Sequence, residues 1–221
     1  MYHAETFGRK AMIFDMDGTL LDSMPFWGDS ADRFLMKRGV RPPPGLYEAL
    51  KDLSMVQTAD YLRERFGVTG TVQDVMDGIN EVMEESYFHQ IPPKADILSF
   101  VDRLARAGVR MCVATATDRY LAEAALKRVG LLGRFEFLLT CTEVGAGKHL
   151  PVIYERACER LGLPREEVVV FEDALYAVET AKAAGFPVVA IADRSAAGDE
   201  PRIRALADRF VKQYAELNEW E

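Results

Sequence analysis

The chain has 221 residues, of which 49% are hydrophobic and 28% are charged, and its formal net charge is -8 at pH 7. This length accommodates one large core, or one core together with a smaller domain. The acidic balance argues against a nucleic-acid partner, because nucleic-acid binding requires a basic face. No apolar run approaches the ~20 residues needed to cross a bilayer, so we expect no membrane partner.

Cysteine usage and the amino terminus indicate the compartment. Cys112, Cys141 and Cys158 are far apart and odd in number, which argues against a disulfide framework or a zinc site. Residues 1–10 contain no apolar stretch of the kind found in a signal peptide. We therefore expect a cytoplasmic protein whose thiols are reduced.

Short apolar runs alternate with longer amphipathic stretches along most of the chain. The runs are rich in β-branched and aromatic residues and are apolar on both faces, which is typical of buried parallel strands. The predicted strands span residues 11–14, 110–114, 137–139, 168–171 and 187–191. The predicted helices span residues 95–107, 118–129, 151–161 and 174–184, and a glycine follows each of them. This alternation predicts an α/β fold with a Rossmann-like, doubly wound parallel sheet.

The interval between the first two predicted strands is too long for a single crossover. Its sequence favours helices over residues 23–38, 45–50, 55–66 and 71–89. We therefore predict an inserted α-helical cap at residues 23–91, with hinges near Ser23 and Ile91. The core domain then comprises residues 1–22 and 92–221.

Polar residues stand where the predicted strands end, which is the edge where open α/β sheets bind ligands. They come from four segments that are far apart in the sequence. These residues are Asp15, Asp17, Thr115, Lys148, Glu172 and Asp173.

This set of side chains suits phosphoryl transfer. Several carboxylates in one crevice repel each other without a cation, and oxygen ligands without nearby His or Cys select Mg²⁺. Asp15 can attack phosphorus, while Asp17 can protonate the leaving oxygen and later deprotonate water. The Thr115 hydroxyl, the Ala116 N–H and the Lys148 ammonium can hold phosphate oxygens.

The same motifs resemble those of the haloacid dehalogenase-like hydrolase superfamily. Residues 15–23 look like its first signature, and Thr115, Lys148 and the pair Glu172-Asp173 follow in the family order. The helical insert stands where the phosphatase and β-phosphoglucomutase-like branch has its cap. The resemblance therefore implies a capped core with the active site between the two parts.

The resemblance also implies residue roles. Asp15 would be the nucleophile, and Asp17 would be the general acid/base and would give its backbone carbonyl to Mg²⁺. Asp15 and Asp173 would bind the metal through their carboxylates, and Glu172 directly or through water. Thr115, with the Ala116 N–H beside it, and Lys148 would hold the phosphate.

Two departures from the family pattern affect the interpretation. Val152 replaces an Asp that often follows the Lys motif, which puts local support of Lys148 in question. Trp27 stands where the β-phosphoglucomutase branch has a His, which weakens the mutase interpretation. A true dehalogenase would lack Asp17, and a phosphonoacetaldehyde hydrolase would need a Schiff-base Lys, for which Lys37 and Lys51 are candidates.

We therefore predict a Mg²⁺-dependent phosphatase that acts on a small phosphorylated metabolite, such as a sugar phosphate. The alternatives are a sugar phosphomutase and a non-catalytic phosphate-binding module on the same fold. Phe26, Trp27 and Gln57 are candidates for substrate specificity, because cap side chains close over the leaving group. The sequence does not indicate an oligomeric state.

Overall fold

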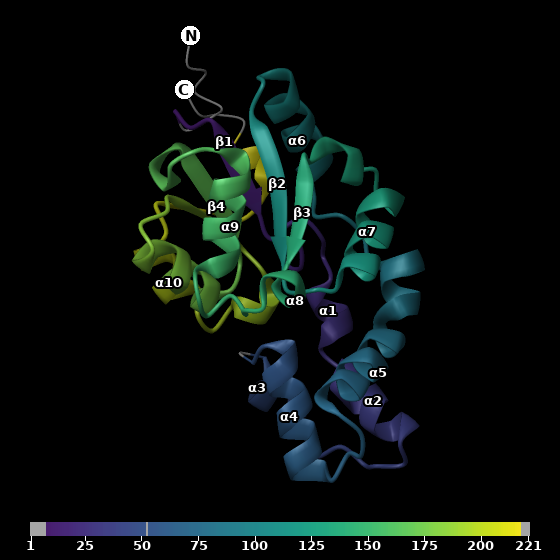
Figure 1. Ribbon diagram of the computed structural model, residues 1–221. Helices are drawn as coiled ribbons and strands as arrows, with labels where there is room; N and C mark the ends of the chain where they lie inside the picture. The colour runs from purple at the N-terminus through teal and green to yellow at the C-terminus, as the bar shows by residue number, and fades with distance from the viewer. Residues whose placement is uncertain (1–7, 52, 218–221) are drawn as a thin grey trace.

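A computed structural model describes residues 8–51 and 53–217 of the chain, and its centre is a parallel sheet (Figure 1). The sheet has six strands in the order β3-β2-β1-β4-β5-β6, and every pair of neighbours is parallel. The strands are β1 Ala11–Phe14, β2 Arg110–Thr115, β3 Phe137–Thr140, β4 Val168–Glu172, β5 Val188–Ile191 and β6 Arg209–Val211. All five predicted strands are confirmed, and β6 is an additional short strand at the edge.

Helices cover both faces of the sheet because successive strand residues point to opposite sides. Met12 and Phe14 of β1 belong to one buried cluster, together with residues of α6 and α7. Ala11 and Ile13 belong to the other, together with residues of α9, α10 and α11. These helices are α6 Ile97–Arg106, α7 Arg119–Arg128, α9 Val152–Leu161, α10 Leu175–Ala183 and α11 Glu200–Leu206. The predicted α/β fold with a doubly wound parallel sheet is confirmed.

The chain between β1 and α6 forms the helical cap, which lies beyond the carboxyl ends of the strands (Figure 1). Its own buried cluster includes Phe34, Leu62 and Ile79. The cap helices are α1 Met24–Trp27, α2 Ser30–Lys37, α3 Leu46–Leu50, α4 Met55–Phe66, α5 Val72–Glu85 and the π-helix η2 Ser86–Gln90.

The single helix predicted over residues 23–38 is wrong, because α1 and α2 are separate. The Ser30 hydroxyl donates to the carbonyl of Trp27 at 2.9 Å, and the Arg33 guanidinium donates to the carbonyl of Phe26 at 3.2 Å. These side chains occupy carbonyls that a continuous helix would have used for its own backbone bonds. The backbone leaves helical geometry at Asp29, where φ is -119° and ψ is 7°.

The last cap helix changes its winding near its end. The prediction extended it over residues 71–89, but α5 ends at Glu85 and η2 continues it as a π-helix to Gln90. Arg128 of α7 donates to the carbonyls of Tyr87 and Ile91, at 3.2 Å for Tyr87. This contact anchors η2, which contains Tyr87, to the core.

The two links between cap and core run side by side. The Asp22 N–H donates to the carbonyl of Pro92 at 3.0 Å, and the Lys94 N–H donates to the carbonyl of Leu20 at 2.9 Å. The Lys94 ammonium also lies 2.5 Å from the carboxylate of Asp193, which follows β5. The entry and exit of the cap are thus tied to each other and to the sheet.

Further short elements complete the described chain. They are α8 Cys141–Val144 and the 3₁₀ turns η3 Leu132–Arg134, η4 Arg165–Glu167, η5 Arg194–Ala196 and η6 Tyr214–Leu217. In this part of the chain, no helix combines the length and apolar character that a membrane span requires.

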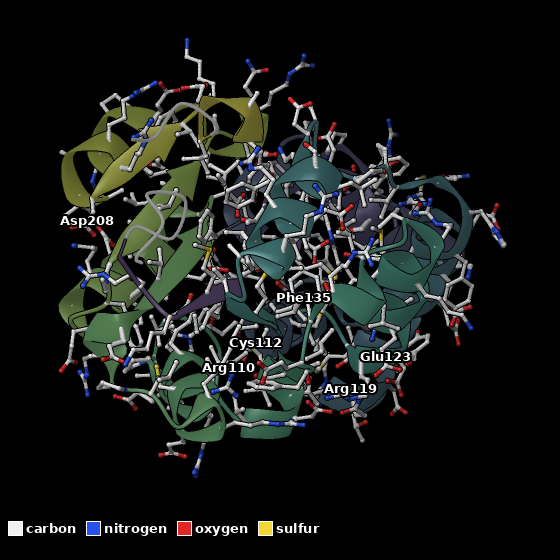
Figure 2. All side chains as sticks on the ribbon, turned by 90° about the horizontal axis from the view of Figure 1, so that it is seen from above. Arg110, Cys112, Arg119, Glu123, Phe135 and Asp208 are labelled. Atoms are coloured by element: carbon white, nitrogen blue, oxygen red, sulfur yellow. The ribbon has the colours of Figure 1, made fainter. Side chains whose placement is uncertain are left out.

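The cysteines fit the prediction of unpaired thiols. Cys112 and Cys158 are buried and Cys141 is partly buried, and all three are free. Figure 2 labels Cys112, which is fully buried, and the ion pair of Arg119 with Glu123, whose side chains are 41% and 45% exposed.

Candidate active site

The loop after β1 brings Asp15 to the carboxyl edge of the sheet. The Asp15 N–H donates to the carbonyl of Phe171 at 2.9 Å, which fixes the loop to the neighbouring strand β4. Gly18 has φ of 83°, in the left-handed region that favours glycine. A β-carbon there would lie 2.6 Å from Cγ of Asp173. Glycine is therefore required both for the turn and for the close approach of Asp173.

Three carboxylates meet at this edge. Asp15, Glu172 and Asp173 each offer an oxygen within 4.8 Å of the others, and all three residues are buried. Burial, with the charges of Glu172 and Asp17, raises the pKa of Asp15 to about 8 against the opposing effect of Lys148. Burial and the charge of Asp15 raise the pKa of Asp173 well above its usual value.

This carboxylate cluster fits a divalent cation such as Mg²⁺. Its ligand atoms are all hard oxygens, which suit Mg²⁺ rather than zinc. Oδ2 of Asp15 is buried and has no hydrogen-bond partner within the described chain, so it is an acceptor available to a cation. A cation would also relieve the repulsion that raises the pKa values of Asp15 and Asp173.

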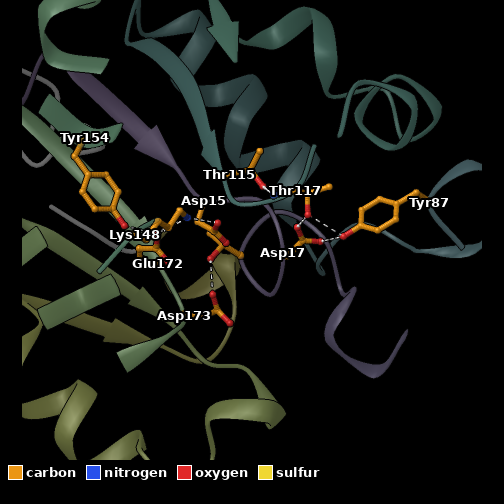
Figure 3. A network of polar contacts seen from close by, with 10 residues as sticks. Asp15, Asp17, Tyr87, Thr115, Thr117, Lys148, Tyr154, Glu172 and Asp173 are labelled. Atoms are coloured by element: carbon orange, nitrogen blue, oxygen red, sulfur yellow. Dashed lines mark hydrogen bonds and ion pairs between the residues drawn. The ribbon is translucent and has the colours of Figure 1, made fainter. Parts of the chain in front are cut away.

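Lys148 supplies the positive charge of the site (Figure 3). Its ammonium donates to Oδ1 of Asp15 and, at 2.6 Å, to Oε1 of Glu172, and the residue is 3% exposed. Burial acts to lower the pKa of Lys148, but Asp15 and Glu172 raise it well above its usual value. Lys148 therefore remains a cation at neutral pH and can bind an anionic group.

Tyr154 of α9 supports this ion pair, and the sequence did not reveal it. Its hydroxyl donates to Oε1 of Glu172 at 2.7 Å, and its side chain is fully buried. Because Tyr154 lies on the apolar face of a helix, its sequence pattern is that of an ordinary core aromatic. Val152 stands in place of the family's Asp, and α9 begins without a side-chain cap. The contact of α9 with the ion pair of Lys148 and Glu172 is therefore made by Tyr154.

Asp17 belongs to a second network, made with hydroxyls (Figure 3). Its Oδ1 accepts from the Tyr87 hydroxyl and its Oδ2 from the Thr117 hydroxyl, both at 2.6 Å. Trp27 donates its Nε1–H to the Tyr87 oxygen at 2.8 Å. Burial and the charge of Asp17 raise the pKa of Tyr87 well above its usual value, so Tyr87 keeps its proton at neutral pH.

Thr115 and Ala116 lie at the end of β2, beside Thr117. Thr115 is fully buried, and its hydroxyl oxygen accepts a hydrogen bond from the Thr117 N–H at 3.0 Å. Ala116 and Thr117 line the cavity described next. The predicted phosphate-binding residues of this strand thus lie at the same edge as Asp15.

A cavity of about 810 Å³ lies between the strand ends and the cap. Asp15, Asp17 and Lys148 form part of its wall on the core side. Trp27 and Gln57 form part of its wall on the cap side.

The three candidates for specificity differ in their surroundings. Gln57 uses its Oε1 to accept from the Ser54 N–H at 2.8 Å, which caps α4. Phe26 packs against the buried cluster of the core and is not among the described residues that line the cavity. Trp27 packs against both the core cluster and the cap cluster. Trp27 therefore has the most direct position between the two parts.

Known proteins share this fold and this arrangement of the chain. A phosphorylated carbohydrates phosphatase of Thermotoga maritima is 26% identical over 176 residues, covering 80% of this chain and 82% of the relative. Hexitol phosphatase A of Escherichia coli is 29% identical over 196 residues, covering 88% and 87%. The crystal structure of CbbY from Rhodobacter sphaeroides in complex with phosphate is 25% identical with a TM-score of 0.80, covering 95% of this chain and 96% of that chain.

A family model matches a range of the chain that includes all the site residues described above. The model of the family described as haloacid dehalogenase-like hydrolase matches residues 9–185. This range includes both carboxylate segments, Lys148 and the cap. The chain belongs to the haloacid dehalogenase-like hydrolase family.

Proposed function

We propose that the chain is a phosphatase that hydrolyses a small phosphomonoester, such as a sugar phosphate, through a phosphorylated Asp15. The observation that carries the proposal is the buried contact of Lys148 with Asp15 and Glu172, beside Asp173. Relatives named as carbohydrate and hexitol phosphatases support the substrate class. We also propose residues 23–91 as the cap, and residues 1–22 and 92–221 as the core.

In the first step, an Asp15 carboxylate oxygen would form a bond to phosphorus while the bond from phosphorus to the ester oxygen breaks. Asp17 would give its proton to that leaving oxygen. In the second step, Asp17 would take a proton from water, whose oxygen attacks phosphorus and releases Asp15 and phosphate. Lys148 and the loop at Thr115 and Ala116 would hold the phosphate oxygens in both steps.

Mg²⁺ would be held by the carboxylates of Asp15, Glu172 and Asp173, with the Asp17 backbone carbonyl as the further ligand that the family resemblance implies. When bound, it supplies positive charge that offsets the charge of the phosphate and of the carboxylates. The cap would close the cavity over the leaving group and exclude water during the first step.

Phosphate release in the presence of Mg²⁺ tests this proposal. A panel of sugar phosphates, polyol phosphates and small phosphorylated acids should include at least one substrate for the wild type. Asp15→Asn should abolish release, and acid quenching of the wild type should trap one phosphoryl group on Asp15, detectable by mass spectrometry. Asp60→Asn is a matched control, because the half-exposed side chain of Asp60 pairs with Arg63 at 3.5 Å on cap helix α4, outside the carboxylate cluster.

Each result has a definite meaning. Near-normal turnover by Asp15→Asn, or a trapped phosphoryl group on another residue, would show that Asp15 is not the nucleophile. Conversion of a sugar phosphate to its isomer through a bisphosphorylated sugar, without free phosphate, would assign the chain as a mutase. Phosphate binding without any turnover would assign it as a binding module.

A further inference from the structure

Asp17 is held by hydrogen bonds to both of its carboxylate oxygens. Tyr87 donates to Oδ1 and Thr117 donates to Oδ2, both at 2.6 Å, and the two hydroxyl oxygens lie 3.2 Å apart. Bonds to two different oxygens fix the plane of the carboxylate as well as its position. Asp17 therefore has one defined orientation in the site, and two residues outside the first motif determine it.

Tyr87 is itself fixed from three sides. Its hydroxyl accepts from Trp27 Nε1 at 2.8 Å, and the two rings pack edge to face with centroids 6.2 Å apart. Its side chain is fully buried, and its carbonyl accepts from Arg128 of α7 at 3.2 Å. Such a constrained hydroxyl can hold a partner in place at little further entropic cost.

The two aromatic residues belong to the two ends of the cap. Trp27 is the last residue of α1, directly after the chain enters the cap, and Tyr87 lies in η2, directly before the chain returns. Asp17 and Thr117 belong to the core loops after β1 and β2. The orientation of Asp17 thus depends on where both ends of the cap lie relative to the core.

We propose that Tyr87, held by Trp27, is a positioning residue that aligns Asp17 for proton transfer to the leaving-group oxygen. This inference rests on the proposed function, because it concerns the residue that would protonate that oxygen. A hydroxyl suits the role, since it can donate to a carboxylate and, by turning, accept from a carboxylic acid. The competing explanation is that Asp17 merely satisfies a buried Tyr hydroxyl.

The basicity of the leaving group distinguishes the two explanations. Benzyl phosphate leaves an alkoxide that requires a proton, whereas 4-nitrophenyl phosphate leaves a stable phenolate that does not. Both esters carry one aromatic ring, so their leaving groups are of similar size and should fit the cavity similarly. The ratio kcat/KM reports the first step only, in which the leaving group departs. Misalignment of Asp17 should therefore lower kcat/KM for benzyl phosphate much more than kcat/KM for 4-nitrophenyl phosphate.

The experiment compares kcat/KM for the two esters in Tyr87→Phe. We expect a fall of about 10- to 100-fold for benzyl phosphate and of less than about 3-fold for 4-nitrophenyl phosphate, because general acid catalysis is worth at least that much. Tyr120→Phe is the matched control: Tyr120 is an exposed tyrosine whose hydroxyl donates to Glu84, and its removal should change neither value.

Trp27→Phe provides a second variant, which removes the donor to Tyr87 and replaces the indole with a smaller aromatic ring. It should shift the ratio of the two kcat/KM values in the same direction by a smaller factor. The double variant should shift this ratio no further than Tyr87→Phe alone, because Trp27 acts through Tyr87. Thermal melting establishes that each variant folds, and Trp27→Phe decides the question if Tyr87→Phe does not fold.

Equal losses on both esters, or no loss on benzyl phosphate, would overturn the role of Tyr87. Independent shifts by the two substitutions would overturn the role of Trp27. Failure of the proposed function looks different, because the wild type would then release phosphate neither from these esters nor from any member of the panel above, or Asp15→Asn would hydrolyse both esters.

Discussion

Gly18 has no room for a side chain, because Asp173 occupies the space beside its α-carbon. The two residues are separated by 155 positions in the sequence, but they are in contact in the fold. A β-carbon on Gly18 would lie 2.6 Å from Cγ of Asp173. The contact makes the first motif and the end of β4 a single unit. A side chain at position 18 should therefore disturb the carboxylate cluster.

Gly18→Ala should therefore displace Asp173 and strain the turn. The positive φ of 83° and the clash together should lower the free energy of unfolding by about 1 to 3 kcal/mol and weaken Mg²⁺ binding. Denaturant unfolding and Mg²⁺ titration measure the two effects. Gly133→Ala is the control, since a β-carbon there meets nothing within 4 Å. Unchanged Mg²⁺ affinity in Gly18→Ala would contradict the dependence on Asp173.

Tyr154→Phe should loosen the pair formed by Glu172 and Lys148. The variant loses one hydrogen bond to a buried charged group, so we expect a loss of about 1.5 to 3 kcal/mol in the free energy of unfolding. Phosphate should also bind more weakly, because Lys148 is less firmly oriented. Denaturant unfolding and inhibition by inorganic phosphate measure these changes. Phosphate inhibition equal to that of the wild type would show that Tyr154 supports the fold alone.

Removal of Mg²⁺ should abolish turnover, and its return should restore turnover. Because Mg²⁺ binds the ionised carboxylates, it competes with protons on groups whose pKa is raised, as in Asp15 with a pKa of about 8. The rise in melting temperature on adding Mg²⁺ should therefore be larger at about pH 8 than at about pH 6. Full activity in EDTA, or a rise that is independent of pH, would contradict this metal site.

Asp193→Asn should destabilise the junction of cap and core. Burial acts to raise the pKa of Asp193, but hydrogen bonds from Lys94 and Ser195 outweigh it and leave the pKa below its usual value. The ionised form is thus the one that stabilises the fold, by about 1 to 3 kcal/mol relative to the variant. This difference should be fully present above the unfolded pKa and should vanish as the pH falls through the folded pKa.

Unfolding of Asp193→Asn and of the wild type, followed from about pH 7 to about pH 3, measures the difference. Asp208→Asn serves as a comparison. Asp208 directly precedes β6, at the amino ends of the strands, where it pairs with Lys182 and is far more exposed than Asp193. A difference for Asp193→Asn that stays constant over this range would show that its charge does not contribute.

The strands were predictable because β1 and β4 are buried on both faces, so their apolar runs are unbroken. The edge strand β6 was missed, since Arg209 and Phe210 are only partly buried and three residues give no pattern. The break between α1 and α2 was also missed, because it depends on side-chain bonds from Ser30 and Arg33 to backbone carbonyls.

The same reasoning applies to the site. Asp15 and Glu172 stand directly at strand ends, so their proximity follows from the parallel sheet alone. Tyr87 and Tyr154 reach the site from helices, and nothing in their local sequence separates them from core aromatics. Tyr87 meets Asp17 across 70 positions of the chain, through a π-helix that periodicity does not predict.

The position of Trp27 and Tyr87 at the two ends of the cap limits how caps can be exchanged between relatives. A chimera that replaces residues 30–85 keeps both residues and their contact with Asp17. A chimera that replaces residues 24–90 brings its own end residues and must supply an equivalent pair of donors. Under the proposed role of Tyr87, the first chimera should retain the orientation of Asp17, whereas the second should retain it only if its own end residues donate to Asp17.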